Sequence, residues 1–425
     1  MFLVIYMNKV YLCIDLKSFY ASVECVERGL DPMKSNLVVA DPSRGKGSIC
    51  LAITPHLKEL GIRNRCRVYE IPENIDYITA MPRMKKYIEY SANIYAIYLK
   101  YVSKEDIHVY SIDEAFLEIT NYLKITKKTP VEFAKMIMKD IYNTYGITAT
   151  AGIGTNLYLA KVALDIIAKH SPDFIGILNQ DSYRKKLSFY EPLSDFWQIG
   201  KNIQKHLERL NIHNMYELSQ ADEKLLFKEF GMNARLLIDH SKGIEPTTIK
   251  EIKEYKPISK SISTSQVLFT DYSYEDARKV LVEMLDILYL ELIKIHKYTS
   301  HIHFFVGYSK DTIQCLSVSK KIKEPTNSFQ KLLKILLDEY TQKVNKNEKI
   351  RRLGITLSIL NSPVSFQLNL FENTNTNDNL GNTINSIKNK YEKSSIFRGV
   401  SLEEKSTALE RNKLIGGHNA EGEIR

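Results

Sequence analysis

Residues 110–120, with the sequence YSIDEAFLEIT, limit the fold of this chain more than any other stretch. They predict a strand at 107–110, a tight polar turn and a second strand at 115–119, with the adjacent carboxylates Asp113 and Glu114 in the turn. Asp and Glu are poor strand formers, and two charges near an apolar core stay ionised only if a cation or hydrogen bonds compensate them. Mg²⁺ would do so, because it takes hard oxygen ligands. A hairpin turn that is acidic without binding a metal is the alternative at this point.

A third carboxylate, Asp15, follows the apolar run 10–14 and precedes an expected helix at 19–27. If the strand that ends at Asp15 lies beside the hairpin in one sheet, Asp15 meets Asp113 and Glu114. Three carboxylates on adjacent strands make a site for two metal ions. Two metals about 4 Å apart stabilise both the attacking and the leaving oxygen of a phosphoryl transfer. The sequence therefore indicates a metal-dependent nucleotidyl transfer.

Two motifs carry a resemblance to a known family. Residues 14–24 (IDLKSFYASVE) and 111–116 (SIDEAF) closely resemble the Y-family translesion DNA polymerases, in particular the bacterial UmuC-like (ImpB/MucB/SamB) branch, over residues 9 to about 360. The resemblance implies a multidomain α/β (α+β) fold shaped as a right-hand polymerase. Its expected parts are a ferredoxin-like catalytic palm at 9–28 and 81–170, small fingers at 29–80, a helical thumb at 171–245, a linker at 246–258, a little finger of β-α-β-β-α-β order at 259–360 and a tail at 361–425.

The resemblance also implies an activity, which is template-directed, low-fidelity DNA synthesis from dNTPs in DNA repair and the SOS response. No second acidic cluster in the sequence suggests a proofreading exonuclease, and the expected fingers are small. A mismatched or damaged base is rejected mainly where a site is tight. An open site therefore implies synthesis across lesions.

Composition and charge fit this class of protein. The chain has 425 residues, a net charge of +9 and a pI near 8.9, and residues 250–352 hold 19 Lys and Arg against 13 Asp and Glu. A basic balance favours polyanions such as nucleic acid as partners. The five cysteines form no C-x-x-C pair, which suits a reducing cytoplasm. The apolar residues 1–6 are too few for a membrane segment, and Met7 is an alternative start.

For the metal site, the resemblance implies that Asp15, Asp113 and Glu114 bind two Mg²⁺ ions, with the backbone carbonyl of Leu16 assisting. One ion activates the primer 3′-hydroxyl, and the other holds the triphosphate and offsets charge on the departing pyrophosphate.

For the nucleotide, Phe19 and Tyr20 follow the first metal ligand directly. Tyr20 matches the family's steric gate, an aromatic side chain under the sugar that excludes a ribose 2′-hydroxyl. A core aromatic at a helix start is the alternative. Lys169 matches the family's triphosphate lysine, whose ammonium stabilises the transition state electrostatically.

The fingers depart from the better-known pattern. Where many members carry a Tyr and an Arg for the triphosphate, this chain has Pro55 and Lys58. Lys acts as a point charge and cannot fork onto two oxygens as Arg does, which leaves the strength of nucleotide binding open. We expect the hydroxyl of Thr54 to contribute instead.

Residues 199–212 contain a signature of DNA-backbone binding. Gly200 stands at an expected helix start, and Leu207 and Leu210 give that helix an apolar spacing. Backbone N–H groups at such a start can hold a DNA phosphate. The stretch resembles a helix-hairpin-helix, and an ordinary helix start after a turn is the alternative.

The tail contains a short apolar peptide. Residues 367–371 (QLNLF) closely match the bacterial sliding-clamp-binding pentapeptide, with Gln367, Leu368, Leu370 and Phe371 as the contact residues. Residues 372–379 are of low complexity and too polar to fold alone. Beyond them we expect only a short amphipathic helix near 401–412.

The expected partners are primer–template DNA, dNTPs and the sliding clamp (beta), together with accessory subunits of the kind that UmuC-like relatives can need; no membrane is expected. Two alternatives belong to other classes. A second two-metal nucleotidyl transferase, such as a nucleotide cyclase, would not need the basic unit at 259–360 or the clamp-like peptide. A non-catalytic clamp-associated DNA-binding protein would have no reason to keep three clustered acidic residues.

Overall fold

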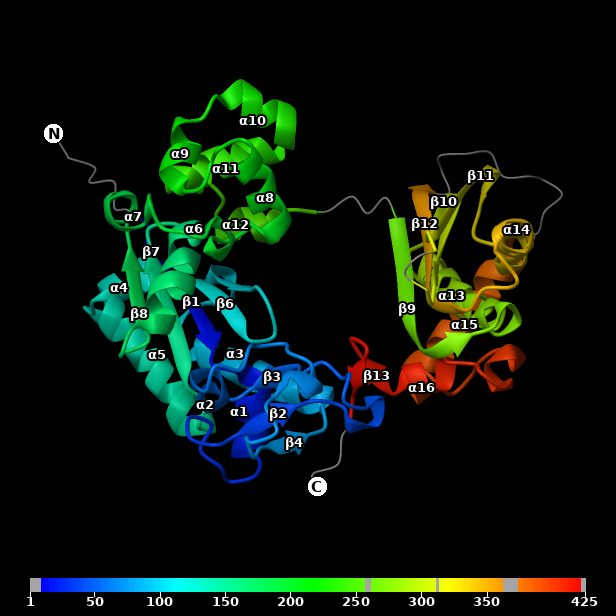
Figure 1. Ribbon diagram of the computed structural model, residues 1–425, viewed down its shortest axis with the longest axis horizontal. Helices are drawn as coiled ribbons and strands as arrows, with labels where there is room; N and C mark the ends of the chain where they lie inside the picture. The colour runs from blue at the N-terminus through cyan, green and yellow to red at the C-terminus, as the bar shows by residue number, and fades with distance from the viewer. Residues whose placement is uncertain (1–8, 257–260, 311–312, 362–373, 422–425) are drawn as a thin grey trace. The chain divides into compact units, whose positions relative to one another are not determined.

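The computed structural model describes residues 9–256, 261–310, 313–361 and 374–421 (Figure 1). The chain divides into two compact units, residues 1–256 with 418–425, and residues 257–417. Each unit has its own core and is described by itself. In the part of the chain that the structure describes, no helix has both the length and the apolar character needed to cross a membrane.

A five-stranded sheet of order β5-β6-β1-β7-β8 forms the palm of the first unit. Every residue of the central strand β1 except Asp15 is buried, because strands flank it on both sides and helices cover the sheet. The strands are β1 (Tyr11–Leu16), β5 (Ile107–Val109), β6 (Glu114–Glu118), β7 (Ala149–Gly154) and β8 (Ile175–Leu178).

Helices pack against this sheet: α1 (Phe19–Val26), α3 (Met84–Tyr101), α4 (Thr120–Thr126), α5 (Pro130–Tyr145) and α6 (Leu157–Val162). After α6 the chain continues through a π-helical turn (Ala163–Ile167) and a 3₁₀ turn (Ala168–His170). Glycines let α6 approach the sheet closely, since a Cβ on Gly152 would lie 2.1 Å from the carbonyl oxygen of Ala160. The side chains of α6 are thereby held directly over β7.

The palm differs from the sequence prediction in two places. The predicted all-helical region from 171 onward begins with β8, which pairs in parallel with β7. The palm was also expected to end in one continuous helix at 157–169, which leads to Lys169, but its geometry changes to π and 3₁₀ after Val162. Short buried strands such as β8 carry too few residues for their period to be read from sequence.

The fingers have a three-stranded sheet of order β3-β2-β4. Its elements are β2 (Leu37–Val39), β3 (Ala52–Ile53), β4 (Ile78–Ala80), α2 (Pro55–Glu59) and the 3₁₀ turns Pro42–Arg44 and Val68–Glu70. The strand β4 pairs in parallel with β2. Val38, Ile53 and Leu57 form the centre of a separate small core.

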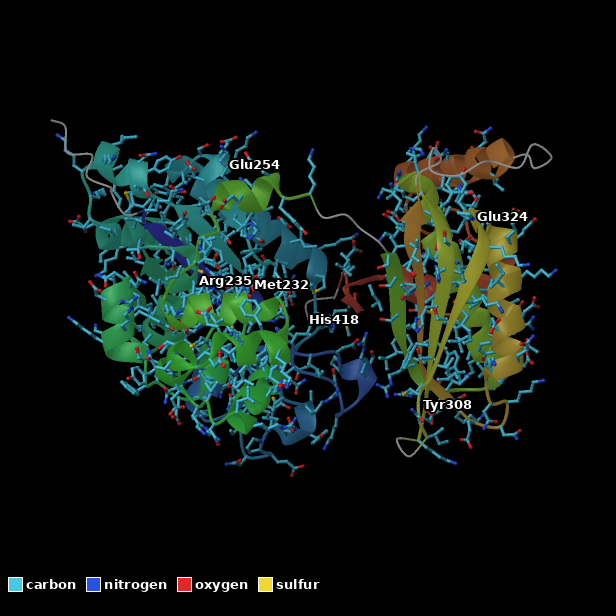
Figure 2. The ribbon with its side chains drawn as sticks, turned by 90° about the horizontal axis from the view of Figure 1, so that it is seen from above. Met232, Arg235, Glu254, Tyr308, Glu324 and His418 are labelled. Atoms are coloured by element: carbon cyan, nitrogen blue, oxygen red, sulfur yellow. The ribbon has the colours of Figure 1, made fainter. Side chains whose placement is uncertain are left out.

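The thumb is helical, and its residues Leu207, Met215, Leu226 and Leu237 share one core with α6 and β8 of the palm. Its elements are α7 (Gln180–Leu187), α8 (Lys201–Arg209), α9 (Met215–Gln220), α10 (Glu223–Phe230) and α11 (Asn233–Ser241), with a 3₁₀ turn at Leu193–Asp195. At the start of α11, Met232 and Arg235 lie on the exposed surface of the thumb (Figure 2).

The stretch expected to be a linker at 246–258 contains a helix, α12 (Ile249–Glu254), and residues 257–258 lie outside the described part. Ile249 is 1% exposed and packs with Tyr11 and Phe116 in a palm core. A capping box between Thr248 and Glu251 starts the helix. The charged composition of 244–255 therefore hides a helix that docks through one apolar face.

The second unit contains the little finger, in which the expected β-α-β-β-α-β order is confirmed (Figure 1). Its elements are β9 (Ser261–Tyr272), α13 (Tyr274–Lys294), β10 (Tyr298–Tyr308), β11 (Leu316–Thr326), α14 (Phe329–Lys343) and β12 (Ile350–Asn361). The strands form an antiparallel sheet of order β11-β10-β12-β9. Phe304 and Leu357 belong to the core between this sheet and the helices.

The tail folds against the little finger, contrary to the expectation for residues 372–379. Within the second unit it forms α15 (Thr374–Tyr391), a 3₁₀ turn (Gly399–Leu402), α16 (Ala408–Asn412) and the short strand β13 (Leu414–Ile415), whereas β14 (His418–Asn419) belongs to the first unit. Asn385 of α15 donates to the carbonyl of Leu290 at 3.0 Å, so α13 supplies the surface that this polar helix needs. The clamp-like residues Gln367, Leu368, Leu370 and Phe371 lie outside the described residues.

Candidate active site

The register of β1 against β6 brings the predicted carboxylates together. Asp15 and Glu114 are direct cross-strand partners, and the Leu16 amide donates to the carbonyl oxygen of Asp113 at 2.9 Å. Side chains at directly opposite positions of an antiparallel pair are close neighbours, roughly 5 Å apart at Cβ. The amides of Tyr110 and Ser111 both donate to the carbonyl of Glu114, at 3.0 and 3.1 Å, and close the turn. Chain regions about a hundred positions apart thus contribute to one acidic corner of the palm.

Two lysines of the segment after β7 neutralise this acidic corner. The Nζ atom of Lys161 lies 2.7 Å from Oε2 of Glu114, and the Nζ atom of Lys169 lies 3.4 Å from Oδ2 of Asp15. Asp165 lies between the two lysines, at 3.1 Å from Lys161 and 2.7 Å from Lys169. Sequence reasoning gave no role to Lys161 or Asp165, although the spacing 161, 165, 169 places all three on one helix face.

Further contacts orient the carboxylates. The thiol of Cys13 donates to Oε1 of Glu114 at 3.1 Å, and the hydroxyl of Ser111 donates to Oδ1 of Asp113 at 2.7 Å. Both oxygens of Glu114 are therefore engaged, one by Lys161 and one by Cys13. As placed, no group of three or more His, Cys, Asp or Glu side chains within the described ranges is arranged to hold an ion.

Burial and neighbouring charges both shift the pKa values at this corner. Burial raises the pKa of Asp15 to about 6, and Asp113 and Glu114 add to the rise while Lys169 opposes it. Burial alone would lower the pKa of Lys161, but Asp165, Cys13 and Glu114 outweigh it and raise that pKa. The available donors are hard oxygens, namely carboxylates and the Leu16 carbonyl, which fit Mg²⁺. An added cation would favour ionised Asp15.

Phe19 and Tyr20 open α1, directly after the acidic corner. Phe19 is buried, whereas Tyr20 is half-buried and stacks on Tyr87, with ring centroids 4.5 Å apart and an angle of 18° between the planes. Tyr87 is held in turn, because its hydroxyl donates to Glu24 at 2.7 Å. Burial raises the pKa of Tyr20, and the charge of Asp113 adds to the rise. Tyr20 is thus a braced ring at the edge of the site.

The fingers add a positive charge to the site. Burial lowers the pKa of Lys58, Asp15 opposes this shift, and the charges of Lys169 and Lys17 add to it. Lys17 was not singled out from the sequence. Thr54 is fully buried, and its hydroxyl accepts the Leu37 amide at 3.2 Å, so the structure places Thr54 in the fingers core.

Comparison with known proteins gives consistent matches. The impB/mucB/samB family model matches residues 14–165, and the model of that family's C-terminal domain matches residues 259–370. The "Putative UV-damage repair protein UvrX" of Bacillus subtilis (strain 168) is 34% identical over 417 residues, which cover 97% of this chain and 98% of the relative. The same organism's "DNA polymerase IV 2" is 31% identical over 424 residues, covering 97% and 99%.

A solved structure has a similar fold. It is a Y-family DNA polymerase chimera of Dbh and Dpo4, with a TM-score of 0.64 and 21% sequence identity, and the match covers 83% of this chain and 99% of the chimera.

Proposed function

The chain belongs to the impB/mucB/samB family of Y-family DNA polymerases, and from this premise we propose that it is a DNA-directed DNA polymerase that extends primers across damaged template bases. The observation that carries the proposal is the pairing of Asp15 with Glu114, with Asp113 held beside Leu16. The cyclase alternative has no use for the basic four-stranded unit. Primer extension by the wild-type chain separates the proposal from the non-catalytic alternative.

Asp15, Asp113 and Glu114, with the carbonyl oxygen of Leu16, would hold two Mg²⁺ ions, which supply activation of the primer 3′-hydroxyl and neutralisation of the triphosphate. Lys161 orients Glu114, because the ion pair between them is almost wholly buried. Lys161 and Cys13 engage both oxygens of Glu114, so binding of an ion by Glu114 would displace one of these contacts.

The three lysines would bind the triphosphate. Lys17, Lys58 and Lys169 come from different elements, and the charges of Lys17 and Lys169 both act on the pKa of Lys58. Clustered ammonium groups repel, and an anion between them relieves that repulsion. Lys58 and Lys17 thus take the place of the guanidinium that many family members present, as point charges without the bidentate fork.

Tyr20 would lie under the sugar of the incoming nucleotide. Its ring is supported from behind by Tyr87, so it cannot move away from an added 2′-hydroxyl without breaking that stack. A braced aromatic ring is the physical requirement for a steric gate.

DNA would be held through its backbone. Gly200 caps α8 without a side-chain hydrogen bond, so the first amides of α8 are available to a phosphate. On the little finger, α13 and α14 cover one face of the sheet, and the strand register places small, polar or basic side chains on the other face: Ser263, Ser265, His303, Ser319, Lys321 and Arg352. Such side chains suit phosphate contacts, which position a duplex without reading its sequence.

We also propose that Gln367, Leu368, Leu370 and Phe371 bind the sliding clamp, and that accessory subunits contribute to activity. The support is the peptide's sequence and its position between β12 and α15. Purified clamp should retain the full chain on a column, and replacement of Leu370 and Phe371 by Ala should abolish retention while leaving clamp-independent primer extension unchanged.

Primer extension tests the central proposal. The full chain should extend a primer on an undamaged and on an abasic template in the presence of Mg²⁺, and Asp113→Ala should abolish extension while leaving duplex binding intact. Asp140→Ala is the matched control, because Asp140 is a palm carboxylate that bonds Lys100 and Tyr101 away from the site. Extension by Asp113→Ala at near the wild-type rate would show that the acidic corner is not catalytic.

A further inference from the structure

An aromatic contact joins the hairpin that carries Asp113 and Glu114 to the thumb. Tyr110 is the residue directly before the turn that carries Asp113, and its hydroxyl accepts the indole N–H of Trp197 at 3.1 Å. The two rings also meet edge-on, with centroids 5.9 Å apart and an angle of 77°. Phe116 on β6 packs against both rings, at 5.8 Å from each. Tyr110 is therefore held on one side by the palm strand and on the other by the thumb.

The other partner, Trp197, belongs to the turn that leads into α8. Gln198 has a φ of +70°, and Ile199 is buried, so the direction of the chain from Trp197 to Gly200 is well defined. The amides after Gly200 are the ones available to a DNA phosphate. A phosphate bound there would act on a short, ordered segment that ends in the indole.

The indole is braced from behind by a stack of buried rings. His240 lies parallel to Trp197, at 6.2 Å and 17°, and Tyr158 lies parallel to His240, at 3.9 Å and 19°. His240 pairs with Glu245 at 3.0 Å, and both side chains are at most 6% exposed. Packed aromatic rings of this kind have little freedom to rotate. Movement of the α8 turn is thus transmitted to Tyr110 instead of being absorbed behind Trp197.

We propose that Trp197 and Tyr110 are positioning residues that couple duplex binding at the α8 turn to the placement of Asp113 and Glu114. The inference rests on the proposed polymerase function. A duplex phosphate at α8 holds Trp197, and the hydrogen bond from the indole N–H holds Tyr110. Tyr110 in turn holds the turn, because its backbone amide donates a hydrogen bond of 3.0 Å to the Glu114 carbonyl. Coupling between two sites is reciprocal, so metal binding at the hairpin also changes the surroundings of Trp197.

Tyr110→Phe is the sharpest perturbation, because it removes the hydroxyl and keeps the ring. The loss of one neutral hydrogen bond should lower the single-turnover extension rate at saturating dNTP about 2- to 10-fold, with the KM for dNTP and the duplex Kd within about twofold of wild type. Trp197→Phe should have a similar effect, and the double variant should be no slower than the slower single variant. Tyr122→Phe is the control, because it deletes a palm hydroxyl bonded to Asp106 and should leave the rate unchanged.

The indole itself gives a second readout, since Trp197 is the only tryptophan of the chain. Addition of Mg²⁺ to the wild-type chain bound to primer–template should shift the indole emission, and this shift should disappear in Tyr110→Phe while the shift on duplex binding persists. Circular dichroism shows whether each variant is folded. If Trp197→Phe does not fold, the rate and the emission of Tyr110→Phe decide the outcome.

Three results would overturn the inference: a Tyr110→Phe rate equal to that of Tyr122→Phe, a loss of duplex affinity with the rate at saturation unchanged, or effects of the two single variants that multiply in the double variant. Failure of the wild-type chain to extend any primer would instead refute the proposed function, and this inference with it.

Discussion

Replacement of Lys161 by Met should destabilise the first unit strongly, because it removes the only cation that contacts Glu114 within the described residues. The side chains of this pair are 8% and 9% exposed. Asp165 would keep Lys169 as its partner at 2.7 Å, but Glu114 would keep only the thiol of Cys13. Removing one member of a buried ion pair leaves an uncompensated charge and costs about 3–5 kcal/mol. We expect a loss of that size in the free energy of unfolding, measured without divalent metal.

Urea unfolding followed by tryptophan emission measures this loss for the first unit alone, because Trp197 is the single tryptophan and lies in that unit. Lys100→Met is the matched control. The Lys100–Asp140 pair is 57% and 23% exposed, and such pairs contribute about 0–1 kcal/mol. The combined variant Lys161→Met and Glu114→Gln should recover most of the stability, because a neutral amide needs no cation. Equal losses for Lys161→Met and Lys100→Met, or no recovery in the combined variant, would refute the reasoning.

Two further substitutions test the nucleotide site and the tail. Tyr20→Ala should raise ribonucleotide use relative to dNTP use by at least about tenfold, because discrimination by steric contact ends when the contact is removed. Single-nucleotide incorporation assays measure this ratio, and Tyr142→Ala, at an exposed tyrosine, is the control. A ratio equal to that of the control would exclude the gate. Glu283→Ala should expose residues 392–412 to limited proteolysis, because the buried Glu283 carboxylate accepts the amides of Thr407 and Ala408 at 2.9 and 3.2 Å, and each orphaned amide costs about 1–3 kcal/mol. Proteolysis no faster than in Glu291→Ala, on the exposed face of the same helix, would count against that anchor.

The parts of the fold that the sequence predicted are those with strong local patterns. The hairpin around Asp113, the strand that carries Asp15 and the β-α-β-β-α-β order each combine apolar runs with clear turn residues. The convergence of Asp15 on Glu114 could be expected because charges at strand ends are tolerated only where they meet a compensating group.

The missed parts depend on tertiary contacts. The composition of α15 contains many Asn and Thr residues and predicts no fold, yet α13 offers it a packing surface and an acceptor at Leu290. The sequence of α12 predicts a linker, because only the helix face with Ile249 is apolar and the other side chains are mostly charged. The buried position of Thr54 depends on the Leu37 strand beside it, which no local pattern indicates. Propensity is a weak guide where packing against another element decides the outcome.

The two lysines of the acidic corner differ in exposure, and we propose that they therefore take different parts in the reaction. Lys161 is 8% exposed and faces Glu114, so leaving that contact would bury an unpaired charge on each side. Lys169 is 41% exposed and is shared between Asp15 at 3.4 Å and Asp165 at 2.7 Å, so solvent partly screens its contact with Asp15. We propose that Lys169 turns toward an arriving triphosphate, which offers more negative charge than Asp15 does, and that this movement frees the Asp15 carboxylate for a cation. In this proposal, nucleotide entry and completion of the metal site are linked through one side chain, while Lys161 keeps the other end of the corner in place.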